Sequence, residues 1–268
     1  MMKNYILLFS FVTFLATCHG DVANHEHGSN FNIFPLRMKT GLGEEYIPEV
    51  IALKCSSWRL GVETRNIISF KAIPKECGAY ISNYLQGDQY RSDSKTVNRE
   101  GFFYLKTLNL KGDGKDVWVF DLDDTVLSNL PYYVKHGFGT ESANVTAFNE
   151  WINLGEAPAL PETLKLYNKL LAAGVKIVFL SGRSLKRKEI TEKNLKLAGY
   201  NTYEKLILKD LSIYRRTSTI TYKSAERKKL EEEGYRIIGN SGDQWGDILG
   251  TNTGARTFKL PNPLYIVN

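Results

Sequence analysis

Two aspartates stand directly after a short apolar run, and their spacing is suited to metal binding or nucleophilic chemistry. Asp121 and Asp123 follow the sequence Val117-Trp-Val-Phe120. Because side chains alternate along an extended chain, both carboxylates are expected on the same side, at the carboxyl end of a strand. Such a pair offers hard oxygen ligands for Mg²⁺, and one carboxylate can also act as a nucleophile.

Three further polar segments stand beside other predicted elements. Ser181-Gly182-Arg183 supplies a hydroxyl, an unhindered backbone N–H and a cation near a helix start, a set that suits a phosphoryl group. Lys223 precedes a charged helix, and Gly242-Asp243-Gln-Trp-Gly-Asp247 provides a second acidic pair. Each segment alone is also typical of a solvated turn, a loop or a helix cap. Their convergence on one sheet edge favours a shared site.

The elements that must position these residues alternate between apolar strands and amphipathic helices. Short apolar runs predict strands over residues 117–120, 175–180, 206–208, 236–239 and 257–260. Helical spacing predicts helices over residues 77–85, 95–108, 161–173, 184–198 and 224–233. This order predicts an α/β fold with a mainly parallel sheet, whose active site lies beyond the carboxyl ends of the strands.

The first twenty residues are typical of a secretory signal peptide. An uncharged run after Lys3 ends at Ala16, too short for a comfortable membrane span, and a small-residue cleavage site follows at about Gly20. A retained anchor is the alternative. Residues 21–50 are polar and irregular, so we expect them to form an N-terminal arm, with residues 51–268 as the folded domain.

The composition argues against several classes of protein. With 43% hydrophobic and 24% charged residues, the chain has globular proportions, and its three cysteines are too few for a four-cysteine zinc site. The formal charge of +6 comes from basic residues spread along the chain, which argues against a nucleic-acid partner. Four histidines weigh against enzymes that use a nucleophilic histidine or a His-rich two-metal centre.

Two covalent modifications follow from the predicted secretory route. Once the signal peptide is removed only Cys55 and Cys77 remain, and in an oxidising compartment we expect a bridge between them, although two buried free thiols are the alternative. The bridge would stabilise the fold by roughly 3 kcal/mol. Asn144-Val-Thr146 is an N-glycosylation sequon within an insertion over residues 128–160, and we expect Asn144 to carry a glycan.

Together the polar segments resemble the motifs of the haloacid dehalogenase (HAD) superfamily of phosphotransferases. The matching motifs, in order, are Asp121-x-Asp123-x-Thr125, Ser181, Lys223 and Gly242-Asp243-x-x-x-Asp247. Ser128-Asn-Leu-Pro-Tyr-Tyr133 and Phe258-Lys-Leu-Pro-Asn-Pro-Leu-Tyr265 are similar, more narrowly, to plant acid phosphatases and vegetative storage proteins. The resemblance implies a Rossmann-like core, a small helical cap over residues 128–160 and an N-terminal helical extension.

The resemblance also implies an activity, that of a Mg²⁺-dependent acid phosphatase hydrolysing small phosphomonoesters through an aspartyl-phosphate intermediate. Asp121 would be the nucleophile, and Asp123 would be the general acid and then the general base. The groups implied to bind the phosphoryl oxygens are Ser181, the Gly182 N–H and Lys223. The ligands implied for Mg²⁺ are Asp121, the backbone carbonyl of Asp123, Asp243 and Asp247.

A second function stays open, because the resembling group includes vegetative storage glycoproteins with weak or no phosphatase activity. A mutase of the same superfamily is disfavoured by the short cap and the signal peptide, and a lectin-like glycoprotein would leave the four motifs unexplained. The signal peptide implies delivery to the vacuole or the cell exterior, without membrane attachment after cleavage. A homodimer follows from the resemblance alone.

Overall fold

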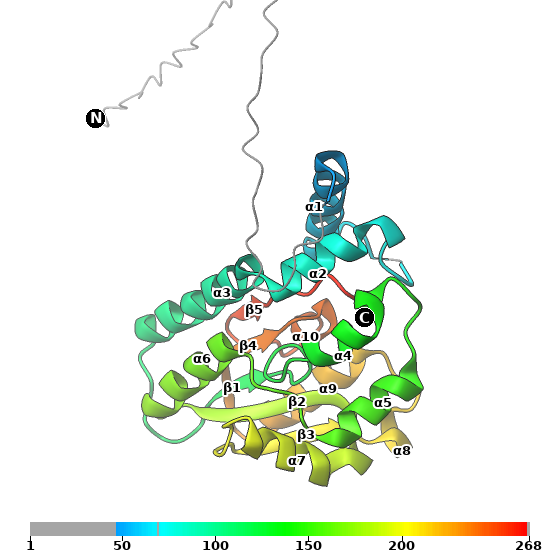
Figure 1. The fold of residues 1–268 in the computed structure, drawn as a ribbon. Helices are drawn as coiled ribbons and strands as arrows, with labels where there is room; N and C mark the ends of the chain where they lie inside the picture. The colour runs from blue at the N-terminus through cyan, green and yellow to red at the C-terminus, as the bar shows by residue number, and fades with distance from the viewer. Residues whose placement is uncertain (1–46, 69, 267–268) are drawn as a thin grey trace, which may run out of the picture. The chain divides into compact units, whose positions relative to one another are not determined.

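Five strands form one parallel sheet in the order β3-β2-β1-β4-β5, in a computed structural model that describes residues 47–68 and 70–266 (Figure 1). The strands are β1 (Asp116–Phe120), β2 (Lys176–Ser184), β3 (Lys205–Lys209), β4 (Arg236–Gly242) and β5 (Thr257–Lys259). All five were predicted from the sequence, and the predicted α/β fold with a parallel sheet is confirmed. The predicted signal peptide, and the predicted arm as far as residue 46, lie outside the described residues.

The register of the sheet brings its polar segments to one edge. In β1, Phe120 lies opposite Phe179 of β2 and Ser241 of β4. The Asp121 N–H then donates to the Ser241 carbonyl over 3.0 Å. Because parallel strands end at the same edge, the chain segments that follow β1 and β4 leave the sheet side by side.

Helices cover both faces of the sheet, as the alternation of β1 side chains requires. Trp118 and Phe120 pack on one face with side chains of α3 (Asp88–Thr107), α6 (Pro161–Ala172) and α7 (Lys188–Leu197). In Figure 1, α3 and α6 run side by side over this face. Val117 and Val119 pack on the other face, with side chains of α8 (Leu211–Tyr214) and α9 (Thr219–Glu232).

Close packing of Trp118 against β4 requires a glycine. A Cβ on Gly239 would lie 2.4 Å from a carbon of the Trp118 ring, which real side chains do not tolerate. The indole Nε1–H donates to Ser241 Oγ over 2.9 Å, so the buried donor is satisfied. A register shift between Val117 and Trp118 accompanies this packing.

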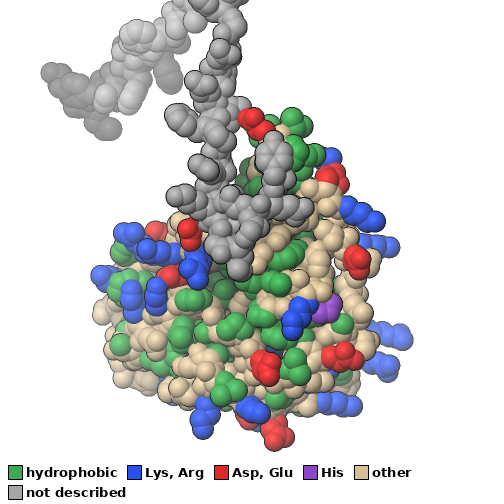
Figure 2. All heavy atoms as spheres, in the orientation of Figure 1, with side chains coloured by type: hydrophobic (Ala, Val, Ile, Leu, Met, Phe, Trp, Pro, Cys, Tyr) green, Lys and Arg blue, Asp and Glu red, His purple; other side chains and the backbone are tan. Residues whose placement is uncertain are grey.

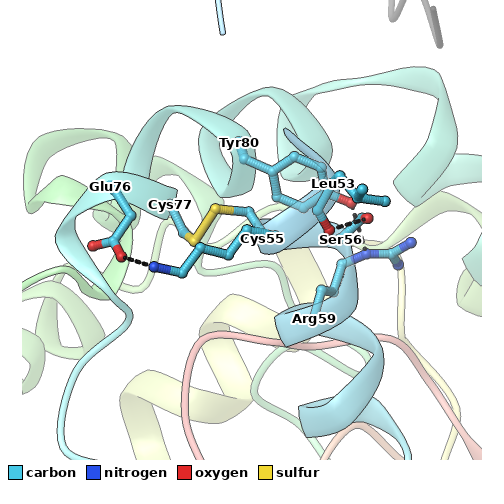
Figure 3. The surroundings of a disulfide bond; sticks show 8 residues. Leu53, Cys55, Ser56, Arg59, Glu76, Cys77 and Tyr80 are labelled. Atoms are coloured by element: carbon cyan, nitrogen blue, oxygen red, sulfur yellow. Dashed lines mark hydrogen bonds and ion pairs between the residues drawn. A yellow bond between two sulfur atoms is a disulfide. The ribbon is translucent and has the colours of Figure 1, made fainter. Parts of the chain in front are cut away.

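A second hydrophobic cluster joins the N-terminal helices to the insertion and to the C-terminal segment. Its helical parts are α1 (Glu49–Glu63), η1 (Lys75–Cys77), α2 (Gly78–Gln86), α4 (Leu130–Lys135) and η2 (Gly137–Gly139). Cys55 of α1 and Cys77 are joined in a disulfide at the centre of this cluster (Figure 3). Beside the disulfide, Lys54 pairs with Glu76 over 2.7 Å.

The resemblance implied an N-terminal helical extension, but the bounds of α1 were not predicted from the sequence, because its apolar pattern is weak. The helix buries Cys55 and Val62, whereas Val50, Leu53 and Leu60 are more than half exposed. The apolar residues of α1 are thus not gathered on one face, and the sequence gives only a weak amphipathic signal for this helix. The predicted helices are present, but α3 begins seven residues before its predicted start and α9 begins five residues before. Lys223 therefore lies within the first turns of α9, and the prediction that it precedes the charged helix was wrong.

The insertion over residues 128–160 contains α4, η2 and α5 (Val145–Leu154), and α10 (Trp245–Ile248) follows β4. Asn144 caps α5, its side chain accepting the Ala147 N–H over 3.0 Å. On the face drawn in Figure 2, basic side chains are spread around the margin, with acidic ones between them. None of the described helices combines the length and apolar character needed to cross a membrane.

Candidate active site

The carboxylate of Asp121 lies against a buried lysine. Lys223, from the first turns of α9, places its Nζ 2.5 Å from Asp121 Oδ1 and 2.7 Å from Asp247 Oδ1. All three side chains are at least nine-tenths buried. Burial opposes the ammonium charge, yet the two aspartates raise the pKa of Lys223 above its ordinary value. The lysine therefore stays cationic and fixes Asp121 from one side.

Three buried carboxylates form a cluster at this edge of the sheet, and two of them contact Lys223. Asp121, Asp243 and Asp247 each offer an oxygen, and these oxygens lie within 4.8 Å of one another. Burial and then the repulsion from Asp247 raise the pKa of Asp121 well above its ordinary value, and the same two causes raise the pKa of Asp243 to about 7. The site thus concentrates more negative charge than Lys223 balances. A hard divalent cation fits this oxygen set.

The loop that carries Asp247 is held by a second buried cation. Arg227 of α9 is fully buried and donates to the backbone carbonyls of Asp247 at 2.6 Å, Leu249 at 2.7 Å and Thr251 at 2.9 Å. These carbonyls lie at the end of α10, where a helix leaves its last acceptors unsatisfied. Arg227 therefore fixes the backbone from which Asp247 projects.

Asp123 faces a different cation. Arg183, at the end of β2, donates from Nε to Oδ2 at 2.9 Å and from Nη2 to Oδ1 at 2.7 Å, and Asn129 Nδ2 donates to Oδ1 at 3.1 Å. Trp151 Nε1 in turn donates to Asn129 Oδ1 at 2.8 Å, which orients the amide. Burial alone would raise the pKa of Asp123, but the Arg183 charge and these hydrogen bonds lower it below its ordinary value.

The carboxylate of Asp243 is surrounded by hydrogen-bond donors from two distant parts of the chain. Thr125 Oγ1 donates to Oδ1 at 3.0 Å and accepts the Asp243 N–H at 2.9 Å. Around Oδ2 lie Gln244 Nε2 at 3.0 Å, Asn262 Nδ2 at 2.8 Å and the Tyr265 hydroxyl at 3.4 Å. The carboxylate is thereby fixed before any ligand arrives.

Asp124 is a further buried acid at this edge, and its role was not predicted from the sequence. Its φ of 59° is in the left-handed region, which aspartate tolerates better than most residues. Its carboxylate accepts the Asn129 N–H at 2.9 Å and the hydroxyls of Tyr133 at 2.7 Å and Tyr265 at 3.2 Å. Burial raises the pKa of Asp124 to about 6, against the opposing effect of the Tyr133 hydrogen bond.

Ser181 and Gly182 lie one strand away from Asp121, at the end of β2. Ser181 is fully buried, and its Oγ accepts the Arg183 N–H at 3.1 Å while its carbonyl accepts the Tyr222 hydroxyl at 3.0 Å. Gly182 is exposed, and a Cβ at this position would meet no atom within 4 Å. The backbone there is open to an approaching ligand.

The structure therefore separates the residues singled out from the sequence into two groups. Asp121, Lys223, Asp243 and Asp247 meet at the acidic cluster, whereas the Asp123 side chain lies with Arg183. The site residues that were given no role from the sequence are Asp124, Asn129, Asn262 and Tyr265, and all four lie in or beside segments that resemble the plant proteins, so local similarity was the only signal for them. Arg183 was expected to suit a phosphoryl group, whereas the structure pairs it with Asp123.

Comparison with known proteins gives the family. The family model described as "HAD superfamily, subfamily IIIB (Acid phosphatase)" matches residues 40–268. The chain belongs to this family.

The relatives of this HAD acid phosphatase chain include proteins named as acid phosphatases and proteins named as storage proteins or glycoproteins. The chain is 52% identical to the stem 28 kDa glycoprotein of Glycine max, over 99% of this chain and 100% of the relative. It is 43% identical to acid phosphatase 1 of Solanum lycopersicum, over 89% of this chain and 92% of the relative. It is 49% identical to vegetative storage protein 1 of Arabidopsis thaliana, over 80% of this chain and 78% of the relative. The predicted resemblance is confirmed.

Membership of the family bears on the acidic cluster. HAD phosphatases generally use a divalent metal, and the buried group of Asp121, Asp243 and Asp247 is the matching feature of this acid phosphatase chain. The family acts on small phosphoesters, and the open backbone at Gly182 lies at the same sheet edge as this cluster.

Proposed function

We propose that the protein is a Mg²⁺-dependent acid phosphatase that works through an aspartyl-phosphate on Asp121. The observation that carries the proposal is the arrangement of two carboxylates on opposite partners: Asp121 against Lys223, and Asp123 against Arg183. One acid is thereby fixed within the metal-binding cluster and the other is fixed outside it. This division of roles is what a nucleophile and a proton carrier require.

In the first step an oxygen of Asp121 attacks phosphorus, a new P–O bond forms, and the bond to the leaving oxygen breaks. Asp123 gives its proton to that oxygen, so an alcohol departs. In the second step Asp123 takes a proton from water as the water oxygen attacks the same phosphorus. The P–O bond to Asp121 then breaks, which releases inorganic phosphate and restores both carboxyl groups.

The phosphoryl oxygens would be bound by the Ser181 hydroxyl, the Gly182 N–H and Lys223. The ammonium of Lys223 already contacts Asp121 and so can neutralise charge on the transferring group without moving far. Exposure of Gly182 leaves its backbone accessible to the substrate. Each of these donors would act on the equatorial oxygens rather than on the leaving group.

Asp121, the backbone carbonyl of Asp123, Asp243 and Asp247 would hold Mg²⁺, a cation that prefers a few carboxylate oxygens and retains water. When bound, this cation offsets the repulsion between the anionic nucleophile and an anionic phosphate. The fit rests on the excess negative charge of the buried carboxylates and on their oxygen-only chemistry.

An acidic working range follows from Asp123. Because Arg183 and its hydrogen bonds lower the pKa of Asp123 against the effect of burial, its proton is present only at low pH. The first step needs that proton, whereas the second needs the carboxylate. We therefore expect turnover to decline as the pH rises to neutrality, and to decline also in strong acid, where the raised pKa of Asp121 leaves the nucleophile protonated.

A storage role is the second candidate, favoured by the 49% identity to a vegetative storage protein. A weak phosphatase that accumulates as a reserve would keep the same fold. The glycoprotein and storage-protein relatives also support a secreted or vacuolar route for this chain, and a glycan on Asn144, whose side chain lies at the exposed start of α5.

Turnover of an aryl phosphate at pH 5–6 separates the candidates. With Mg²⁺ present we expect a kcat of at least ~1 s⁻¹, within the ordinary range for enzymes, and a loss of activity when the metal is chelated. Near-background turnover by a folded protein with Mg²⁺ present would favour storage. Full activity in excess chelator would contradict the metal requirement.

A further inference from the structure

The chain leaves β5 as an irregular segment that passes directly over the acidic cluster. Pro261 and Pro263 have no N–H and therefore cannot extend the ladder beyond Lys259. Residues 260–264 are nevertheless buried. The Leu260 N–H still donates to the Gly242 carbonyl of β4 at 2.9 Å, and beyond it the side chains of Asn262 and Tyr265 turn to the buried acids Asp243 and Asp124.

The side-chain amide of Asn262 is held in one orientation. Its Oδ1 accepts the Leu264 N–H at 3.0 Å, which leaves Nδ2 to donate to Asp243 Oδ2 at 2.8 Å. Because the oxygen is already committed to a backbone donor, the amide cannot rotate by half a turn without losing both bonds. Asn262 is 4% exposed, so water does not readily replace either partner.

Tyr265 joins the two acids that lie beneath this segment. Its hydroxyl is 3.2 Å from Asp124 Oδ2 and 3.4 Å from Asp243 Oδ2. Asp124 also accepts the Tyr133 hydroxyl, so a phenol from α4 and a phenol from the C-terminal segment meet on one carboxylate. The C-terminal segment thus adds donors to two neighbouring carboxylates that already accept hydrogen bonds from Thr125 and Tyr133.

The donors are divided unequally between the two oxygens of Asp243. Oδ2 is surrounded by Asn262, Gln244 and Tyr265, whereas Oδ1 accepts one side-chain hydrogen bond, from Thr125, among the residues that the structure describes. A carboxylate oxygen with one donor keeps a lone pair for a cation. The C-terminal segment therefore determines which oxygen of Asp243 is available.

The position of this segment is set by the N-terminal helices. Lys259 pairs with Glu63 of α1 at 3.0 Å, and both side chains are 16% exposed. Leu264 packs in the hydrophobic cluster that contains the Cys55–Cys77 disulfide. The packing of Leu264 on one side and the Lys259–Glu63 ion pair on the other fix the backbone on both sides of Asn262. A residue that orients a metal ligand must itself be held in place in this way.

We propose that Asn262 and Tyr265 are positioning residues of the metal site, which hold Asp243 with Oδ2 turned to the C-terminal segment and Oδ1 turned to the cation. This inference rests on the proposed function. The partner chemistry is a divalent cation bound through carboxylate oxygen, and neither residue contacts the substrate.

The test is Mg²⁺ affinity, measured by calorimetry on the full chain with Asn262→Ala, Tyr265→Phe and the double variant. Loss of an outer-shell partner generally weakens metal binding 10- to 100-fold. We expect the Mg²⁺ affinity to fall about 10-fold or more in Asn262→Ala and in the double variant. In Tyr265→Phe we expect a smaller, several-fold loss of affinity. Activity at saturating Mg²⁺ should recover while the half-saturating concentration of Mg²⁺ rises.

Tyr167→Phe is the matched control. The Tyr167 hydroxyl lies in the core, where it donates to the Thr202 carbonyl at 2.8 Å and accepts the Thr202 N–H. Its removal should lower the melting temperature and leave the Mg²⁺ affinity unchanged, which separates positioning from general stability. If Asn262→Ala does not fold, Tyr265→Phe decides the question, because it keeps the ring and loses only the hydroxyl.

The outcomes distinguish this inference from the proposed function. Tight binding by the wild type together with weakened binding by the variants supports both. Equal Mg²⁺ affinity of the wild type and the folded variants, within twofold, overturns the positioning role and leaves the proposed function intact. A wild-type protein that binds no Mg²⁺ overturns both.

Discussion

Thr125 and Asp243, 118 positions apart in the chain, exchange two hydrogen bonds in the buried site. The Thr125 hydroxyl donates to Asp243 Oδ1 at 3.0 Å and accepts the Asp243 N–H at 2.9 Å. Thr125 of the first motif thus contacts both the backbone N–H and the side chain of Asp243 in the fourth motif. Its role is to join the two loops that carry the acids, and it needs no contact with a reacting atom.

Thr125→Val tests the contribution of these two hydrogen bonds to stability. Valine keeps the shape but leaves the Asp243 N–H without its partner in a fully buried position, so we expect the free energy of unfolding to fall by roughly 1–3 kcal/mol. Denaturant titration measures the change. Thr125→Ser retains the hydroxyl and should lose less; a loss from Thr125→Ser larger than that from Thr125→Val would show that the methyl group contributes more than the hydrogen bonds.

Asp121→Asn tests the nucleophile. The amide keeps the volume of the side chain but cannot form an acyl phosphate in the same way, so we expect turnover to fall more than ~10³-fold, about 4 kcal/mol of barrier. Asp113→Asn is the matched control, because Asp113 is exposed and pairs with Arg236 before β1, away from the carboxyl edge of the sheet. Retention of most phosphatase activity by a folded Asp121→Asn protein would disprove the assignment.

Arg183→Gln tests how the Asp123 proton is controlled. Burial raises the pKa of Asp123 and the Arg183 charge lowers it, so removal of the charge should raise that pKa. The fraction of protonated Asp123 then persists to higher pH, and the alkaline limb of kcat/KM should move upward in pH while its maximum falls. Arg183→Lys keeps the charge and should show a smaller displacement. An unchanged limb in both variants would mean that another group sets it.

The strands and the acidic motifs could be predicted from the sequence because each depends on local pattern. An apolar run such as Val117–Phe120 predicts a buried strand, and parallel topology then brings the residues after it to one edge. The register adds what local pattern lacks, namely that Asp121 lies beside Ser241 and hence near Asp243.

The donors around these acids could not be predicted in the same way. Asn262 and Tyr265 contact Asp243 from 19 and 22 positions away, in the irregular segment after β5, where neither helical nor strand periodicity applies. Arg183 was noted as a cation suited to phosphate, whereas the structure pairs it with Asp123. Tertiary contacts of single polar side chains leave no periodic signature in a sequence, which is why these roles required the structure.

The pH dependence of stability without metal follows from the buried acids. Burial raises the pKa of Asp124 to about 6 and that of Asp243 to about 7, so the folded state holds these protons more tightly than the unfolded state. This stabilisation is complete below the ordinary carboxyl range and is lost as the pH rises through 6 to 7.

In chelator we therefore expect the melting temperature to fall by about 5 °C or more between pH 5 and pH 8. Thermal scans measure the fall. Mg²⁺ at pH 8 should recover the loss, and Asp243→Asn, which removes one titrating group, should flatten the curve. A melting temperature that rises over this range would contradict the assignment of raised pKa values.

The disulfide should stabilise the protein without taking part in the chemistry. Cys55 and Cys77 are 22 positions apart, and closing a loop of that size stabilises a fold by roughly 3 kcal/mol. The Cys55→Ser/Cys77→Ser variant should lose about that much free energy of unfolding and, below its melting temperature, keep its kcat. Wild-type protein in reductant is the internal control and should match the variant.

Because Leu264 packs in the same cluster, the Cys55→Ser/Cys77→Ser variant should also need more Mg²⁺ for half-maximal activity than the wild type. The increase should be smaller than that caused by Asn262→Ala. A loss of kcat at saturating Mg²⁺ would contradict this prediction, because it would show that the disulfide region affects the reacting groups themselves.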